Sequence, residues 1–164
     1  MRRLATIALA AGLALGVAAP VAARSGPTIT DIAIAVNADS GEFSQLIAAA
    51  SRAGLVEVLD GKRMFTVFAP TDAAFAALYD ALGVDGVDEI PLGTLKAVLL
   101  HHVAPGERFS GDVLSSSRIR TLNRDFVFPS VSGGTPFIDG AAILTPDIDA
   151  SNGVIHVIDE VLLP

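Results

Sequence analysis

The residues with the most versatile chemistry in this 164-residue chain are its three histidines, two of which are adjacent. His101 and His102 fall near the end of an expected helix over about residues 92–102. Adjacent helical residues project about 100° apart, so these two rings cannot converge on one metal ion. His102 shares an apolar face with Leu95 and Leu99, and His101 falls nearly opposite. We therefore expect His102 to be buried and hydrogen-bonded, and His101 to be exposed to solvent.

His156 lies in the last expected strand, where residues 154–158 are apolar on both sides. That pattern is typical of a central strand, so we interpret His156 as a core residue and not as a ligand. The chain has no cysteine, and a tetrahedral zinc site would need carboxylates from elsewhere. We expect neither a metal ion nor a cofactor.

Asp147 and Asp149 resemble the start of a calcium-binding loop, but the match ends there. Asn152 stands where that loop needs a glycine, and Ile158 stands where it needs a bidentate glutamate. We interpret residues 145–151 as an acidic surface loop without a bound ion.

Two further patterns bear on this region and on catalysis. The pair Asn152-Gly153 is a turn signal before the last strand, because both residues tolerate positive φ. The sequence contains no G-x-S-x-G nucleophile motif, and no base is paired with its run of serines at 115–117. We therefore predict a protein that is not an enzyme.

The elements that would position these residues are helical in the first half and strand-like in the second. Thr30 or Asp31 is expected to cap the first helix, and Thr71 or Asp72 the helix that follows a strand at 64–68. This order favours an α+β fold over alternating α/β units. Helices are expected near 29–36, 42–53, 73–82 and 92–102, and short strands near 118–122, 125–131, 136–139, 141–144 and 154–163.

The N-terminus is typical of a secretory signal peptide. Arg2 and Arg3 precede an uncharged apolar stretch over residues 4–20, and Val21-Ala22-Ala23 supplies small residues for cleavage. We predict a signal peptide at 1–23 cut after Ala23, a short leader at 24–29, and one domain at 30–164. No later segment is long and apolar enough to cross a bilayer, so we expect a secreted protein, periplasmic or extracellular.

The charge of the chain restricts its partners. The net charge is −7, and removal of residues 1–23 would leave 9 basic and 18 acidic residues, or −9. Nucleic acids and anionic membranes repel such a surface, so neither is expected as a partner. Partners that are neutral, cationic or bridged by metal ions are favoured, and we expect a monomer.

Residues 66–75, Thr-Val-Phe-Ala-Pro-Thr-Asp-Ala-Ala-Phe, together with residues 99–106 and 150–159, resemble the conserved segments of one family, the fasciclin (FAS1) domain. Residues 66–75 resemble its first conserved box. Residues 99–106 resemble its middle segment, which is usually written around a Tyr-His pair. Residues 150–159 resemble its second box. The order and the spacing agree, and the resemblance covers about residues 30–164.

The resemblance implies a fold in which N-terminal helices pack against a wedge of two β-sheets. It implies structural roles for the polar residues of the boxes, with Asp72 capping a helix or bonding across the core and His102 buried. His101 departs from the family, which usually has Tyr there, so the integrin-binding mode of that region in animal relatives is in doubt. The residues assigned to the structural motif are Thr71, Asp72, His102, Asn152, Gly153 and His156.

A second adhesion motif of animal relatives centres on Pro-Asp-Ile, and Pro146-Asp147-Ile148 matches it. We expect an exposed carboxylate beside an exposed aliphatic group there, although an ordinary solvated connection is equally compatible. Our leading hypothesis is adhesion or surface recognition of a cell-surface protein or polysaccharide, with His101, Pro146, Asp147 and Ile148 as partner-binding candidates. The alternative is binding of a carotenoid or another apolar ligand, because some relatives do so and Phe109, Phe126, Phe128 and Phe137 enrich the second half.

Overall fold

The helices of the protein precede most of its strands, as the sequence predicts. The computed structural model describes residues 25–164, so the predicted signal peptide lies outside the described residues. The helices are α1 (Ile29–Ser40), α2 (Ser44–Arg52), α3 (Val56–Leu59), α4 (Asp72–Leu82), the 3-10 helix η1 (Val87–Glu89), α5 (Leu92–His101) and α6 (Ser110–Ser115). The strands are β1 (Phe65–Pro70), β2 (Val103–Pro105), β3 (Ile119–Arg120), β4 (Phe126–Val127), β5 (Pro129–Ser132), β6 (Thr135–Ile138), β7 (Ala141–Ala150) and β8 (Gly153–Ile158).

The main sheet is mixed and has six strands in the order β2-β1-β8-β7-β6-β5. Strands β1 and β8 are adjacent interior strands that run parallel, and their register places Phe68 opposite His156. Every residue of both strands is buried, which explains why they are apolar on both sides. A second sheet consists of β3 and β4 alone. The two boxes of the sequence therefore supply the two strands at the centre of the fold.

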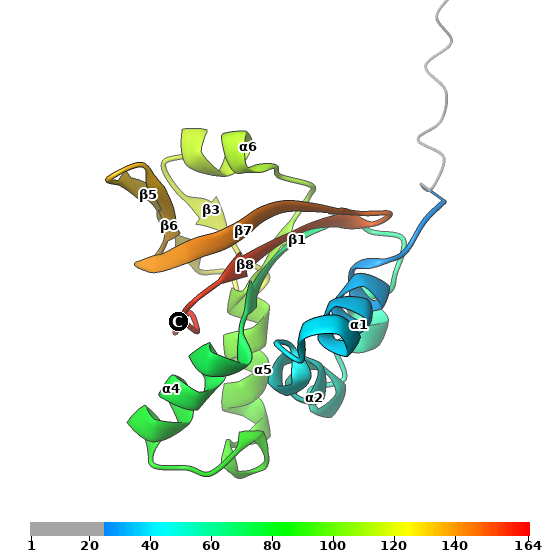
Figure 1. Cartoon of the computed structure of the whole chain (residues 1–164), viewed down its shortest axis with the longest axis vertical. Helices are drawn as coiled ribbons and strands as arrows, with labels where there is room; N and C mark the ends of the chain where they lie inside the picture. The colour runs from blue at the N-terminus through cyan, green and yellow to red at the C-terminus, as the bar shows by residue number, and fades with distance from the viewer. Residues whose placement is uncertain (1–24) are drawn as a thin grey trace, which may run out of the picture.

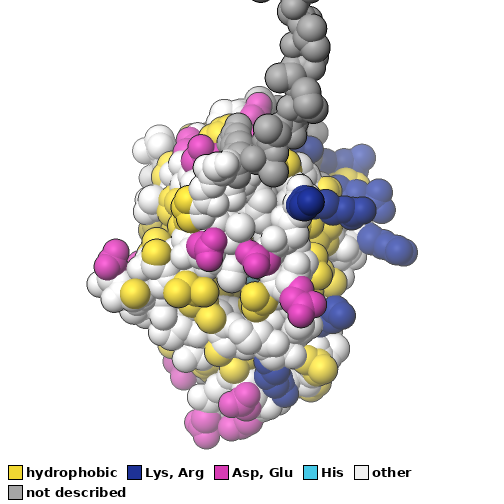
Figure 2. Space-filling model, turned by 90° about the vertical axis from the view of Figure 1, so that its right-hand side faces the viewer, with side chains coloured by type: hydrophobic (Ala, Val, Ile, Leu, Met, Phe, Trp, Pro, Cys, Tyr) yellow, Lys and Arg dark blue, Asp and Glu magenta, His cyan; other side chains and the backbone are white. Residues whose placement is uncertain are grey.

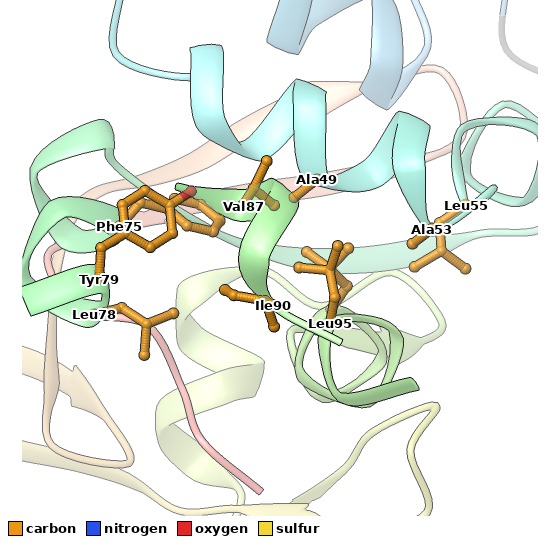
Figure 3. Close-up of a cluster of buried hydrophobic side chains, with 10 residues drawn as sticks. Ala49, Ala53, Leu55, Phe75, Leu78, Tyr79, Val87, Ile90 and Leu95 are labelled. Atoms are coloured by element: carbon orange, nitrogen blue, oxygen red, sulfur yellow. The ribbon is translucent and has the colours of Figure 1, made fainter. Parts of the chain in front are cut away.

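The two faces of the sheet carry different elements. In Figure 1, α1, α2, α4 and α5 lie on one side of β1, β7 and β8, whereas α6 and β3 lie on the other. Helices α2, α4 and α5 and the turn η1 enclose one apolar cluster, in which the rings of Phe75 and Tyr79 lie 6.0 Å apart (Figure 3). The helical layer thus has a core of its own beside the sheet.

The N-terminus of α1 shows how local chemistry sets a helix boundary. Thr28, and not the predicted Thr30 or Asp31, is the N-cap, and its hydroxyl accepts a hydrogen bond from the Asp31 N–H. The Asp31 carboxylate accepts one from the Thr28 N–H, which completes a capping box. These bonds hold the pKa of Asp31 below its ordinary value. Asp31 therefore stabilises the start of α1 from the third helical position and is not the N-cap itself.

Two sequence-based expectations in the second half are wrong. Helix α6 was not expected, because its polar sequence Ser-Gly-Asp-Val-Leu-Ser has little apolar periodicity. Residues 145–150 form the second half of β7 and not a loop. The pairing of β7 with β8 is irregular between Ile143 and Ile148, and Asp147 has a positive φ of 59° there. This irregularity explains why the segment has the composition of a loop while it remains in the sheet.

Candidate functional site

His102 connects the end of α5 to the C-terminal segment. Its side chain is 1% exposed, its Nδ1 lies 2.7 Å from the Val98 carbonyl oxygen, and its Nε2 accepts a hydrogen bond from the Leu162 N–H at 2.9 Å. These partners require a neutral ring with its proton on Nδ1. Burial lowers the pKa of His102 to about 4 against the opposing effect of the Val98 carbonyl. The prediction of a buried, hydrogen-bonded His102 is confirmed.

His156 makes the corresponding connection from the centre of the sheet, with the opposite tautomer. Its Nε2 lies 2.9 Å from the Arg108 carbonyl oxygen, and its Nδ1 accepts a hydrogen bond from the Asp147 N–H. The ring stacks on Phe68 with centroids 5.7 Å apart. Burial lowers the pKa of His156, although the Arg108 carbonyl and the Asp147 carboxylate both act to raise it. His156 is a satisfied core residue, as predicted.

His101 is buried, so the prediction that it faces solvent is wrong. Its side chain is only 2% exposed, because α5 ends at His101 and the chain beyond it folds back over the ring. Its Nδ1 lies 3.4 Å from the hydroxyl of Thr121, and its Nε2 lies 3.8 Å from a carboxylate oxygen of Asp139 with no hydrogen-bond partner. The prediction assumed that only one face of the helix is packed, whereas at this end of α5 the faces that carry His101 and His102 are both buried.

Asp147 is exposed, as the Pro-Asp-Ile match predicts, but its carboxylate is held by hydrogen bonds. Its two oxygens accept hydrogen bonds from the backbone N–H and the hydroxyl of Ser110, both at 2.6 Å. Burial alone would raise the pKa of Asp147, but the bonds from Ser110 and the nearby His156 ring outweigh it and lower the pKa. Ile148 is half-buried against the core, and only Pro146 and part of Asp147 face solvent. The segment joins α6 to the sheet.

Thr71 and Asp72 cap two different helices, α4 and α2. The Thr71 hydroxyl accepts a hydrogen bond from the Ala74 N–H and so caps α4. The Asp72 carboxylate instead accepts one from the Gln45 N–H at 2.9 Å, which caps the first turn of α2. The expectation that Asp72 would cap a helix or bond across the core is confirmed.

Asn152 and Gly153 fix the approach of α1 and α3 to the sheet. The Asn152 side chain accepts a hydrogen bond from the Ile29 N–H and donates to the carbonyls of Leu59 and Gly61. Gly153 has φ 152°, and a Cβ atom there would lie 1.8 Å from the Phe65 carbonyl oxygen. Only glycine permits this contact between the first and second boxes.

The four phenylalanines that suggested an apolar ligand do not form a pocket. An apolar cavity of about 60 Å³ lies between the helices α1, α2 and α3 and the strands β1 and β8, and none of the four lines it. A cavity of about 150 Å³ is needed to hold benzene, so this one is too small for a carotenoid. Phe126 and Phe128 are instead 38% and 54% exposed. These observations do not favour the alternative of an apolar ligand.

Metal-binding clusters and membrane-spanning helices were sought among the described residues. No group of three or more His, Cys, Asp or Glu among residues 25–164 is arranged to hold a metal ion. In the same range, no helix is both long enough and apolar enough to cross a membrane. On the face shown in Figure 2, acidic side chains are scattered among apolar ones, whereas most basic side chains gather along one edge.

The comparison with protein families agrees with the three segments noted in the sequence. The fasciclin domain model matches residues 41–164, which include both boxes and the histidine pair. This chain belongs to the fasciclin family. Within it, the chain is 37% identical to protein sll1483 of Synechocystis, over 90% of the chain and 79% of that protein. It is 36% identical to protein sll1735 of the same organism, over 84% of the chain and 98% of that protein.

Larger fasciclin proteins match over one part of their length. The transforming growth factor-beta-induced protein ig-h3 of Sus scrofa is 35% identical over 74% of the chain, which spans 18% of ig-h3. Among solved structures, a FAS1 domain pair from the insect cell adhesion molecule fasciclin I superposes with a TM-score of 0.67. It is 21% identical over 84% of the chain and 51% of that pair. The predicted FAS1 fold is therefore confirmed.

Proposed function

We propose that this fasciclin protein is a secreted recognition module that binds a cell-surface protein or polysaccharide through exposed segments, without catalysis. The observation that carries the proposal is how the box residues use their polar groups. Both ring nitrogens of His102 and of His156 are hydrogen-bonded to backbone groups, of which the Leu162 N–H and the Arg108 carbonyl belong to distant segments. The side chain of Asn152 likewise bonds the backbone of a distant segment. Groups so committed stabilise a scaffold and are not available for proton transfer to a substrate.

The names of similar proteins support an adhesive role. Fasciclin I is described as an insect cell adhesion molecule, and its FAS1 domain pair has the same fold as this chain. A rigid scaffold that displays loops and edges is suited to recognition, because binding residues concentrate on exposed segments held by a rigid framework. The resemblance to such proteins supports binding as the activity, and the partner is for experiment to identify.

Secretion follows from the N-terminal pattern of this chain. Two arginines, an uncharged apolar stretch and the small residues up to Ala23 form the signature of a signal peptide. We expect the protein recovered from the periplasm or the medium of its host to begin at Arg24. An intact mass that still includes residues 1–23 would contradict secretion by this route.

The recognition function can be tested on intact cells. Fluorescently labelled protein should bind surfaces of the native host or its neighbours saturably, and excess unlabelled protein should compete. Pro146 and Asp147 are the exposed residues of the Pro-Asp-Ile segment, and Pro146→Ser tests this segment without removing the Asp147 carboxylate that bonds to Ser110. Unchanged binding would remove the segment from the contact surface, and an absence of saturable binding to any surface would refute the function itself.

A further inference from the structure

The second, two-stranded sheet has one buried face and one exposed face of unusual composition. In the register of β3 and β4, Ile119 lies opposite Val127 and Arg120 lies opposite Phe126. Ile119 and Val127 are 1% and 0% exposed, so they form the inner face. Directly opposed residues of antiparallel strands point to the same side, so Arg120 and Phe126 share the outer face.

Two neighbours extend this outer face at one end of the hairpin, where β3 begins and β4 ends. Arg118 directly precedes β3, and its guanidinium carbon lies 4.4 Å from the centroid of the Phe126 ring. This cation–π contact orients the guanidinium group on the exposed surface. Phe128 follows β4 in extended chain, two residues after Phe126, and is 54% exposed. We call the four residues Arg118, Arg120, Phe126 and Phe128 the arginine–phenylalanine strip.

The strip is positively charged in an acidic protein. Arg118, Arg120 and Arg124, in the β3–β4 turn, are three of the nine basic residues beyond residue 23, and all three are exposed. Within residues 25–164, none of the three forms an ion pair. Asp125 is the one acid of this turn, and its carboxylate accepts a hydrogen bond from Asn123. The local charge therefore has the opposite sign to that of the whole chain.

The chemistry of the strip identifies the class of its ligand. A guanidinium group binds a carboxylate through two parallel hydrogen bonds, and the negative face of an exposed aromatic ring accepts the C–H groups of a sugar ring. An acidic polysaccharide presents both features at every repeat. We propose that the arginine–phenylalanine strip binds an acidic polysaccharide, with its carboxylates on Arg118 and Arg120 and a sugar face on Phe128.

The size and the surroundings of the strip favour a polymer chain over other anions. A stable protein interface buries about 800 Å² on each partner, far more than four side chains on one short hairpin. A bilayer would face the scattered acids on the rest of the molecule, whereas a chain can follow the strip alone. Screening over about 8 Å at physiological ionic strength weakens repulsion from those distant acids. Repeated weak contacts along the polymer then raise the overall affinity.

This inference narrows the proposed function to one partner class and one surface, and it rests on that function. The probe is soluble alginate, a polymer of uronic acids, titrated in EDTA by calorimetry against protein expressed from the full chain. Neutral dextran, polyglutamate and vesicles of anionic phospholipid are the comparison probes. We expect binding to alginate only, with an affinity that falls as salt increases.

The variants separate the strip from general charge. Arg118→Gln with Arg120→Gln should weaken alginate binding by about tenfold or more, because each arginine makes a charge-assisted contact. Lys62→Gln with Arg63→Gln removes the same charge from two exposed residues outside the strip and should change binding less than about twofold. Phe128→Ala should weaken binding about fivefold, whereas Leu144→Ala, at an equally exposed apolar residue, should not.

Three results would overturn the inference. The first is an absence of alginate binding. The second is an equal loss of alginate affinity in the Arg118→Gln, Arg120→Gln variant and in the Lys62→Gln, Arg63→Gln variant. The third is tighter binding of polyglutamate or vesicles than of alginate through the same strip. Binding of the protein to intact cells without alginate binding would refute the inference alone. If the protein bound neither intact cells nor alginate, the recognition function would be refuted as well.

Discussion

The box region in the main sheet and the arginine–phenylalanine strip on the second, two-stranded sheet use polar groups in opposite ways. In the box region, His102, His156 and Asn152 are 1%, 0% and 5% exposed, and each bonds backbone groups from distant segments. On the strip, Arg118 and Arg120 are exposed and lie outside any ion pair within residues 25–164. The histidines of the boxes, whose side chains could do chemistry, therefore stabilise the fold. The arginines and phenylalanines of the strip form the surface that we propose for binding.

The neighbours His101 and His102 are both buried but differ in their hydrogen bonding. His102 has two good partners, whereas His101 has a buried Nε2 without a hydrogen-bond partner. His101 stands where the family usually has tyrosine. The unpartnered nitrogen is consistent with a site that another side chain fills more completely.

The largest effect is expected at Gly153, where the two boxes touch. Gly153→Ala places a Cβ atom 1.8 Å from the Phe65 carbonyl oxygen, so one central strand must move. We expect a loss of more than about 4 kcal/mol in the free energy of unfolding, measured with urea. The control is Gly111→Ala, where a Cβ atom would meet nothing within 4 Å. Similar stabilities of the two variants would show that the boxes are not in close contact.

The next largest effect concerns the pH dependence that His102 confers. Its folded-state pKa of about 4 lies below the unfolded value of 6.5, so the unfolded chain binds more protons between these values. The stabilisation is therefore complete above pH 6.5 and is lost as the pH falls toward 4. Between pH 7.5 and 4.5 we expect His102 to account for about 2–3 kcal/mol of the change in unfolding free energy.

His102→Gln removes the titrating ring and should flatten the pH dependence of stability by that amount. Urea unfolding of both proteins across the pH range gives the difference directly. His156, whose pKa is also lowered, acts in the same direction in both proteins and cancels in the comparison. Parallel profiles would show that His102 titrates normally in the folded state.

A smaller effect is expected at the junction of α6 with β7. Ser110→Ala removes the hydroxyl that donates to Asp147, and one such hydrogen bond contributes about 1 kcal/mol. Ser117→Ala, at an exposed serine nearby, should leave the unfolding free energy unchanged. Equal melting temperatures for the two variants would mean that the bond from the Ser110 hydroxyl to Asp147 does not stabilise the fold.

The smallest effect on stability is expected on the strip. Arg118→Gln with Arg120→Gln should change the unfolding free energy by less than about 0.5 kcal/mol, because surface substitutions of this kind rarely cost more. A thermal melt checks this in the preparation used for binding. A large destabilisation would show that the two arginines stabilise the fold and would contradict their assignment to a recognition surface.

The sequence predicted the features that depend on local chemistry or on close family resemblance. Thr71 caps its own helix, Gly153 is required at a close backbone contact, and His102 and His156 are buried, all as expected. These features follow from capping, backbone geometry and apolar faces, which neighbouring residues determine.

The features that were missed depend on contacts between distant segments. His101 is covered by chain that lies 20 and more residues later, and Asp147 is held by Ser110, 37 residues earlier. The strip does not follow from the sequence alone, in which Phe126 and Phe128 suggest an apolar ligand. The alternation Arg118-Ile119-Arg120 beside Phe126-Val127-Phe128 was a usable signal, but only the strand register shows which residues face outward.

The central claim, that the box histidines are fully committed to the scaffold, is tested most directly by long-range ¹H–¹⁵N NMR spectra of the imidazole rings. At pH 7 we predict a neutral His102 with its proton on Nδ1 and a neutral His156 with its proton on Nε2. His102 should remain neutral when the pH is lowered to 5. Exchange between tautomers at either ring, or an ordinary titration of His102 near pH 6.5, would contradict the claim.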